Sequence, residues 1–260
     1  MSIHESAVIG PDVQLADGVE VGPFAVLKGK VRVGAGTKIE SHATIGSDAG
    51  EVIIGEETWI FSGASVGSAP QDLSYKGEKS SLVLGNKNVI REFVTLNVGT
   101  DKGGGVTQLG DGNLIMAYTH LGHDCILKDN IVIVNSCQFA GHVEVDSNAV
   151  VGGMSGIAQF CRIGAFAYIG GNSSVNKDVM PYTIAEGNWA KSRATNKIGL
   201  DRAGYSKDEV TKVNKAVRYL TKGERTLDEA LKLIEDELQG SDLVQHLLQF
   251  IKDSKKGIAR

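Results

Sequence analysis

The chain has 260 residues, of which 42% are hydrophobic and 22% charged, so it can bury a substantial core as one large or two modest domains. Its formal net charge of −4 argues against a protein that mainly coats nucleic acid, although a local basic patch would escape that argument. Its three cysteines form no CxxC pair and predict a reducing compartment without disulfides. Neither a leader nor a membrane-spanning apolar run is recognisable, so we expect a cytoplasmic protein without stable membrane insertion.

Branched aliphatic residues recur every six positions through the first two thirds of the chain. Small residues often follow them, and the 33 Gly against only 4 Pro suggest repeated tight corners. Interruptions near residues 68–81 and 98–108 predict external loops. The recurring positions are Ile9, Leu15, Val21, Leu27, Val33, Ile39, Ile45, Ile54, Ile60, Val66, Leu84, Ile90, Leu96, Leu109, Ile115, Leu121, Leu127, Ile133, Phe139, Val145, Val151, Ile157, Ile163, Ile169 and Val175.

A period of six suits neither an amphipathic helix nor a hairpin sheet, and it is typical of a parallel β-helix in which each hexad supplies a short strand and a corner. The aliphatic side chain should point inward, and the small residue after it should let the backbone turn. We therefore predict a mainly β fold, with a β-helix over residues 1–185. The pattern resembles that of the hexapeptide-repeat acyltransferases, which implies a left-handed coil with three hexads per turn.

The remaining residues, 186–260, predict a connector and a C-terminal α-helical region. "NKDVMPYTIAEGNWA" (Asn176–Ala190) carries a Pro and a Gly and is typical of a connector. Ser206–Glu209 and Thr226–Glu229 match capping boxes ahead of helically spaced apolar residues, and Asp242–Lys252 has one apolar face. These helices would either cap the open end of the β-helix or add a partner surface.

Two histidines lie close together in "THLGHDC" (Thr119–Cys125). His120 precedes an inward position and should face outward from a strand, whereas His123 should lie at the next corner. Histidines three residues apart could ligate zinc with a third nearby. Strand and corner would splay them, however, and no thiolate cluster accompanies them, so we expect no metal site.

With three hexads per coil, residues 18 or 36 apart stack on one face. Adding 18 to His123 reaches Gly141, which is followed by His142, and adding 36 reaches Gln159. An imidazole base, a backbone N–H and polar hydrogen-bonding groups would therefore converge on one face of neighbouring coils. This arrangement predicts a functional site.

Several stretches resemble one particular family, the acyl-ACP-dependent UDP-N-acetylglucosamine O-acyltransferases that begin lipid A synthesis. The resemblance covers essentially the whole chain and keeps the family's motif order. It is carried by "APQDLSYKGE" (Ala69–Glu78), "GGGVTQLGDGN" (Gly103–Asn113), "THLGHDC", "FAGHV" (Phe139–Val143), "GGMSGIAQFCRIG" (Gly152–Gly164) and "DVMPYTIAEGN" (Asp178–Asn188).

The resemblance implies a role for each residue of the stacked face. His123 matches the general base that takes the proton from the sugar 3-hydroxyl as that oxygen attacks an acyl thioester. Asp124 matches the carboxylate paired with this base, and the N–H of Gly141 matches the oxyanion donor. Contacts with the acceptor sugar are implied for Asp72, His120, His142 and Gln159, and contacts with the nucleotide for Asn196 and Arg202.

Four positions depart from the family pattern. Ser74 replaces a lysine, Ala158 replaces a histidine, and Ile198 and Ala203 replace a glutamate and an arginine on the nucleotide side. These changes leave the base, its aspartate and the oxyanion glycine intact. Some family members acylate a 3-amino analogue of the sugar, and the departures keep that acceptor open here.

The resemblance also implies how the acyl chain is accommodated. Gly171 matches a position where a small residue leaves room for a longer chain, and Trp189 stands at the other residue lining the end of that groove. We predict that Trp189 limits the length of the acyl chain.

The family further implies a homotrimer with sites between subunits, acyl carrier protein (ACP) and a UDP-amino sugar as partners, and no cofactor. Lys255, Lys256 and Arg260 could attract the acidic carrier, but a frayed basic tail is the expected alternative. Two other functions stay open: an N-acyl- or N-acetyltransferase that uses acyl-CoA on another nucleotide sugar, and a zinc-carrying or purely structural β-helix protein.

Overall fold

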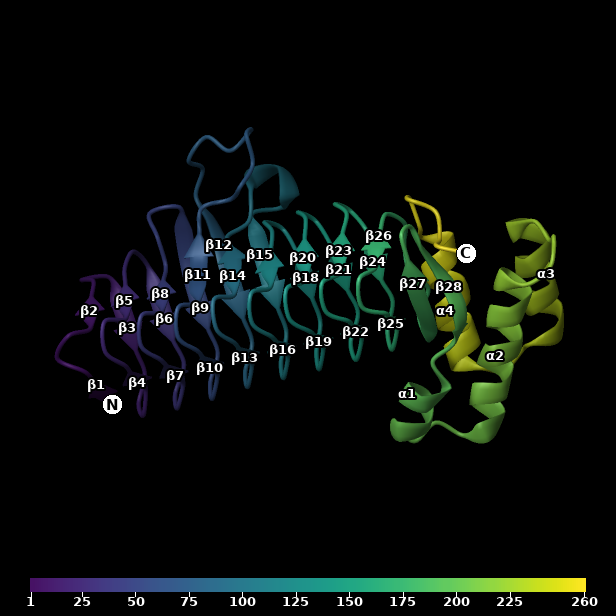
Figure 1. The fold of residues 1–260 in the computed structure, drawn as a ribbon, viewed down its shortest axis with the longest axis horizontal. Helices are drawn as coiled ribbons and strands as arrows, with labels where there is room; N and C mark the ends of the chain where they lie inside the picture. Colours follow the sequence, from purple (N-terminus) through teal and green to yellow (C-terminus); the bar gives the residue numbers. More distant parts are fainter.

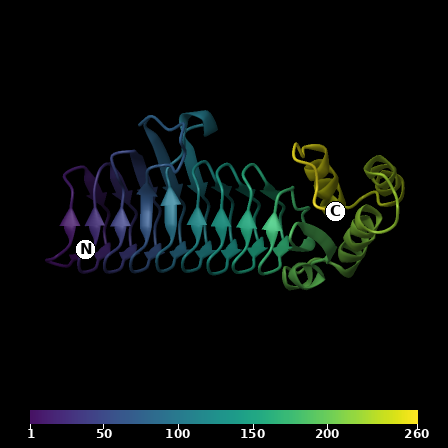
Figure 2. The ribbon, with the colours of Figure 1, turned by 45° about the horizontal axis from the view of Figure 1, so that its top comes forward.

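The computed structural model describes all 260 residues as a long coil of short strands that ends in four helices (Figure 1). The strands lie in three sheets that run along the coil, and rows of parallel arrows mark them in Figure 2. The first sheet contains β1 (Ser2–Ile3), β4 (Glu20–Val21), β7 (Lys38–Ile39), β10 (Trp59–Ile60), β13 (Val89–Ile90), β16 (Leu114–Ile115), β19 (Val132–Ile133), β22 (Val150–Val151), β25 (Tyr168–Ile169), β27 (Thr183–Gly187) and β28 (Ala190–Thr195).

The second and third sheets complete each coil. The second contains β2 (Val8–Ile9), β5 (Val26–Leu27), β8 (Thr44–Ile45), β11 (Ser65–Ser68), β14 (Thr95–Asn97), β17 (His120–Leu121), β20 (Gln138–Phe139), β23 (Gly156–Ile157) and β26 (Ser174–Val175). The third contains β3 (Val13–Leu15), β6 (Val31–Val33), β9 (Gly50–Ile54), β12 (Ser80–Leu84), β15 (Val106–Leu109), β18 (Ile126–Leu127), β21 (Glu144–Val145) and β24 (Arg162–Ile163).

The sheet register confirms the 18-residue stacking. His120 pairs with Gln138, which pairs in turn with Gly156. The recurring aliphatic side chains fill the inside of the coil, and from Val21 onward each is at most 3% exposed. Ile9 and Leu15, in the first coil, are only partly buried because no coil covers them from outside.

Gly46 and Gly67, with φ 80° and 91°, turn the chain after the aliphatic residue as predicted, but most other glycines at this position are needed for a different reason. A side chain at Gly122 would come within 2.9 Å of the Gly141 nitrogen in the next coil, and one at Gly152 within 2.6 Å of the Gly171 nitrogen. The left-handed backbone conformation that turns the chain instead falls two residues later, for example at Asp124 with φ 62°. These glycines therefore permit close stacking of coils.

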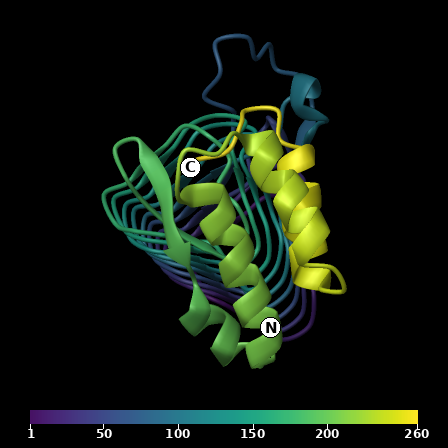
Figure 3. The same cartoon turned by 90° about the vertical axis from the view of Figure 1, so that its right-hand side faces the viewer.

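Two external loops project from the same side of the coil (Figures 1 and 3). Residues 69–79 connect β11 to β12, and residues 98–105 connect β14 to β15. The second loop contains the short 3-10 helix η1 (Asp101–Gly103), whose N-cap is Thr100.

The C-terminal helices are α1 (Lys197–Arg202), α2 (Lys207–Thr221), α3 (Leu227–Glu237) and α4 (Asp242–Lys252). They form a second core of 17 buried residues, which includes Met180 and Tyr182 from the last coil. The helices therefore cap the end of the β-helix, as Figure 3 shows in the view along the coil. None of them has the length and apolar character needed to cross a membrane.

Three details of this end differ from the sequence predictions. The predicted connector is largely a hairpin, because β27 pairs in parallel with β25 and in antiparallel fashion with β28. Thr226 forms both bonds of its capping box, but Ser206 forms only one, since the Glu209 carboxylate accepts the Ser241 hydroxyl at 2.6 Å. The short helix α1 was not predicted at all.

The basic tail is not frayed. The Asp178 N–H donates to the Gly257 carbonyl at 2.9 Å, and the Ala259 N–H donates to the Asp178 carbonyl at 2.8 Å. Ile258 and Ala259 are buried. The last residues therefore dock against the end of the β-helix.

Candidate functional site

His123 and Asp124 lie at the corner that joins the second sheet to the third. We call this corner, in the coils of residues 122–125, 140–143 and 158–161, the site corner. The Nδ1 atom of His123 is 2.7 Å from Oδ2 of Asp124, whose side chain is 1% exposed. This bond orients the imidazole and leaves its Nε2 free to accept a proton when Nδ1 carries one.

The second external loop holds the Asp124 carboxylate in place. The Thr100 N–H donates to Oδ1 at 2.7 Å and the Thr100 hydroxyl donates to Oδ2 at 2.6 Å. The N–H of Asp124 itself donates to the Thr107 hydroxyl at 2.7 Å, and any side chain at Gly103 would overlap the carboxylate. Sequence analysis missed these residues, because the loop places Thr100 24 positions before Asp124 and breaks the count of 18.

Gly141 lies directly beside the His123 ring, as the count predicted. A side chain at this position would come within 2.6 Å of Cε1 and 2.8 Å of Nε2 of His123. The Gly141 N–H donates to no acceptor within the chain. The corner therefore presents an imidazole and an unused backbone donor next to each other.

Three neighbouring groups extend this arrangement. The His142 ring meets the His123 ring edge to face at 5.1 Å and stacks on Phe160 at 4.4 Å. His120 Nδ1 bonds to the Thr95 hydroxyl at 2.7 Å. Burial lowers the pKa of both His120 and His142, a trend that the Asp124 carboxylate partly opposes at His142, so both imidazoles are neutral at neutral pH.

The metal alternative now involves different residues from those predicted. His123, Asp124 and His142 each offer one ligand atom within 4.8 Å of the others, and His120 is not part of this group. The Nδ1 atom of His123 is already hydrogen-bonded to Asp124. A metal ion bound through this Nδ1 atom would have to replace that bond.

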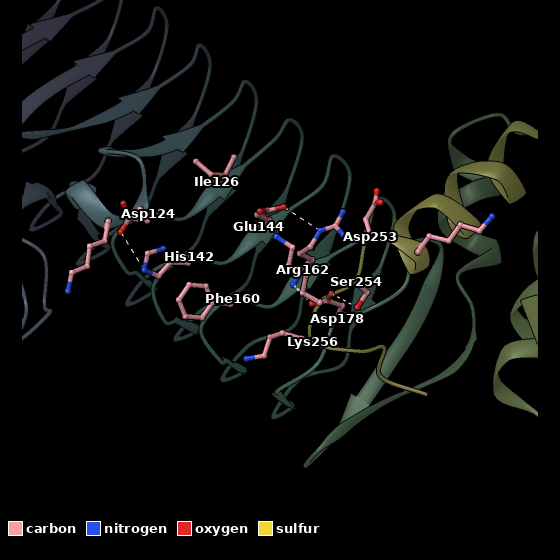
Figure 4. A pocket seen from close by; sticks show the side chains of 14 residues that line it. Asp124, Ile126, His142, Glu144, Phe160, Arg162, Asp178, Asp253, Ser254 and Lys256 are labelled. Carbon is pink, nitrogen blue, oxygen red and sulfur yellow. Dashed lines mark hydrogen bonds and ion pairs between the residues drawn. The ribbon is translucent and has the colours of Figure 1, made fainter. Parts of the chain in front are cut away.

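Cavities open on both sides of the site corner. On the second-sheet side, a cavity of about 570 Å³ is lined by Asn97, His120, His123, Gly141, Gln159 and Trp189. On the third-sheet side lies a groove of about 980 Å³, shown in Figure 4, whose lining includes Asp124, His142, Phe160, Arg162, Ser254 and Lys256. Asn97 was not predicted; its side chain is buried, and its Oδ1 has no hydrogen-bond partner.

Comparison with known proteins matches this chain and its fold to one family. Residues 178–259 match the family described as Udp N-acetylglucosamine O-acyltransferase, domain 2. The chain is 42% identical to the acyl-ACP–UDP-N-acetylglucosamine O-acyltransferase of Alkalilimnicola ehrlichii over 99% of both chains. It is 40% identical to the solved UDP-N-acetylglucosamine acyltransferase of Campylobacter jejuni, with a TM-score of 0.92 over 99% of both chains. LpxA from Acinetobacter baumannii gives 38% identity and a TM-score of 0.94, again over 99% of both.

The chain belongs to the UDP-N-acetylglucosamine O-acyltransferase family. The predicted left-handed β-helix with a C-terminal helical region is thereby confirmed as its fold class. Family membership also excludes the purely structural alternative, since the curated relatives are named as acyltransferases.

Ser74, one of the departures from the family pattern, holds the Asp72 carboxylate of the first external loop. The Ser74 N–H donates to Oδ1 of Asp72 at 2.8 Å, and its hydroxyl donates to Oδ2 at 2.7 Å. These two bonds lower the pKa of Asp72. Unlike a lysine, Ser74 cannot neutralise the charge of Asp72, but its two hydrogen bonds fix the position of the Asp72 carboxylate.

Three predicted residues do not join the site corner within one chain. Asn196 is the N-cap of α1, and its side-chain amide donates to the Phe166 carbonyl at the corner between the third and first sheets. Arg202 is exposed at the end of α1. Gly171 lies at the corner between the first and second sheets and is not among the residues lining the cavity that Trp189 borders.

Proposed function

We propose that this protein transfers an acyl chain from ACP to the 3-position of UDP-N-acetylglucosamine; its relatives are named as acyl-ACP–UDP-N-acetylglucosamine O-acyltransferases. This transfer is the first step of lipid A synthesis. The observation that carries the proposal is the unused Gly141 N–H beside an imidazole that is oriented by a buried carboxylate. Base and oxyanion donor are the two groups that acyl transfer needs.

His123 acts as the general base. Its Nε2 takes the proton of the sugar 3-hydroxyl while that oxygen attacks the thioester carbonyl, and the carbonyl oxygen becomes an oxyanion. The Gly141 N–H donates to this oxyanion. When the tetrahedral intermediate collapses, the carbon–sulfur bond breaks and the imidazolium returns its proton to the leaving thiolate. The products are the acylated sugar and the free thiol of ACP, and the reaction needs no metal or cofactor.

Asp124 stabilises the imidazolium that forms in this step. Its carboxylate already accepts three hydrogen bonds, two from Thr100 and one from His123. Its bond to Nδ1 of His123 fixes the tautomer that leaves Nε2 free.

The cavity on the second-sheet side holds both the acceptor and the acyl chain. His120 and Gln159 line this cavity and His142 lines the adjoining groove; with Asp72 of the first external loop, they are suited to the hydroxyl and amide groups of a sugar. Trp189 borders the same cavity, is 61% exposed and closes the space available to an acyl chain. Gly171 would leave room for the chain beyond this cavity.

We also propose that three copies assemble, so that Asn196 and Arg202 of one subunit serve the site corner of another. Within one chain Asn196 caps α1 and Arg202 ends it, and neither residue lines the cavities beside His123. Large apolar side chains on the corners between the first and second sheets are 53–64% exposed and would be covered by a partner: Phe24, Phe93, Tyr118 and Met154. The assembled enzyme would work in the cytoplasm, where ACP is available.

A 3-amino sugar is the second candidate acceptor. Ser74 and Ala158 remove a lysine and a histidine from the acceptor side, and Asp72 keeps its negative charge there. A site with fewer cationic groups and a fixed carboxylate favours an amine over a hydroxyl more than the usual family site does.

The test is to identify the product by mass spectrometry. UDP-N-acetylglucosamine and its 3-amino analogue would each be incubated with a series of acyl-ACP thioesters. We expect acyl transfer that falls at least about 10³-fold in His123→Ala, because the base is lost. An ester product assigns the hydroxyl acceptor and an amide product assigns the amine; transfer that survives His123→Ala at the wild-type rate contradicts the mechanism.

A further inference from the structure

Peptide groups of successive coils form a hydrogen-bonded chain through the site corner. The His142 N–H donates to the His123 carbonyl at 3.0 Å, and the Phe160 N–H donates to the Gly141 carbonyl at 3.3 Å. We call this series of hydrogen-bonded peptide groups, 123–124, 141–142 and 159–160, the corner ladder. It fixes the plane of the peptide between His123 and Asp124 and the plane of the peptide that follows Gly141.

The corner ladder ends at the Gln159 carbonyl. In earlier coils the corresponding carbonyl accepts an N–H from the next coil. In the coil that follows Gln159, the corresponding N–H is that of Asp178. It donates to the Gly257 carbonyl at 2.9 Å and not to Gln159. The final carbonyl of the ladder therefore needs a donor from another part of the chain.

The C-terminal tail supplies that donor. The Lys256 Nζ lies 2.6 Å from the Gln159 carbonyl oxygen, although the two residues are 97 positions apart. The tail is anchored on both sides of Lys256, by a 2.7 Å bond from the Ser254 hydroxyl to Asp178 and by the buried Ile258. Figure 4 shows Lys256 beside Phe160 at the floor of the groove.

We propose that Lys256 is a positioning residue that caps the corner ladder and so holds the Gly141 peptide and the His123 corner in their reactive arrangement. A cation at the carbonyl end of aligned peptide dipoles is favourable for the same reason as at a helix C-terminus. Its charge also strengthens the first hydrogen bond and polarises those that follow. Lys256 does not itself act on the substrate in this inference, which rests on the proposed acyl transfer.

The experiment compares Lys256→Met with Lys256→Arg and with Lys255→Met in the full-length protein. Lys255 is the adjacent exposed lysine, and it has no hydrogen-bond or ion-pair partner in the chain. We expect Lys256→Met to lower kcat about tenfold, because misplaced groups at a reacting centre act mainly on kcat. The acceptor KM and the melting temperature should change little, Lys256→Arg should recover most of kcat, and Lys255→Met should match the wild type.

A donor without protein separates positioning from attraction of acidic ACP. With an acyl-pantetheine thioester, the kcat deficit of Lys256→Met should persist. Hydrogen–deuterium exchange of peptides covering residues 139–162 should be faster in Lys256→Met than in Lys255→Met. An unchanged kcat, an equal loss in Lys255→Met, or a deficit that disappears with the protein-free donor would each overturn the inference. If the wild type transfers no acyl group, the proposed function fails, and the exchange measurement alone decides whether Lys256 caps the ladder.

Discussion

The site corner and the corner that follows the third sheet have the same backbone, but they differ in whether one backbone N–H of each coil has a hydrogen-bond acceptor. We call the latter, in the coils of residues 55–58, 85–88, 110–113 and 128–131, the polar corner. In the polar corner, a short polar side chain accepts the N–H of the corresponding corner residue of the preceding coil. These bonds run from Glu56 to Asn86, from Asn86 to Asp111, from Asp111 to Asp129 and from Asp129 to Ser147, at 2.6–3.2 Å.

In the site corner, the residues at the capping position either have no side chain or have one that is too long to accept the N–H of the preceding coil. The positions that stack here are His123, Gly141 and Gln159, and none of their N–H groups has an acceptor. Gly141 has no side chain to cap the His123 amide, and it leaves space for the His123 ring. Gln159 is one methylene longer than asparagine and does not cap Gly141. The same scaffold thus becomes either a satisfied surface or a donor for substrate, depending on one side chain per coil.

Gly141→Ala tests this difference most severely. The new methyl group would meet the His123 ring at 2.6 Å, so the ring must move and lose its 2.7 Å bond to Asp124. We expect kcat to fall about 10³-fold, from the misplaced base and a shielded oxyanion donor together. Steady-state kinetics and a melting curve would check this; a folded variant with wild-type kcat would show that the space at Gly141 has no catalytic importance.

Gln159→Asn should convert the site corner into a polar corner. In the polar corner, the Asn86 side chain accepts the Glu56 N–H at 2.9 Å, and an asparagine at 159 would cap the Gly141 N–H in the same way. The oxyanion would then compete with an internal acceptor, and we expect kcat to fall about 10²-fold.

Gln159→Ala is the matched control, because it removes the same glutamine without adding a cap. The loss in Gln159→Asn should exceed that in Gln159→Ala. Equal losses in the two variants would mean that Gln159 acts only through contact with the sugar and that the Gly141 amide is not the oxyanion donor.

Trp189→Ala tests where the cavity beside the site corner ends. Removing the indole lengthens the space next to Val175, which lines the same cavity. Each further buried methylene contributes about 0.8 kcal/mol, so a donor two carbons longer should gain about tenfold in kcat/KM relative to the wild-type preference. Competition between acyl-ACP thioesters of different length measures this directly, and an unchanged preference would assign the end of the groove to other residues.

The sequence predicted the parts of the molecule that follow the repeat. The hexads indicated the strands, and the count of 18 correctly placed Gly141 against His123. The residues that sequence reasoning missed lie across interruptions of the repeat: Thr100 reaches Asp124 from a loop, and Lys256 reaches Gln159 from the tail. Loop closure and tail docking depend on contacts with no fixed sequence spacing, so no periodicity could reveal them.

Asp129→Ala tests the polar corner itself, with the smallest expected effect. It removes the acceptor of the Asp111 N–H, a bond of 2.8 Å near the surface. The loss should be about 1 kcal/mol of stability, or a melting temperature lower by roughly 2–4 °C, while kcat stays at the wild-type value. The control is Asp17→Ala, because Asp17 occupies the same position of the polar corner in the first coil and its carboxylate has no hydrogen-bond partner. Since both variants remove an exposed polar side chain, only the loss of the cap distinguishes them, and equal melting temperatures would show that capping of these amides does not stabilise the coil.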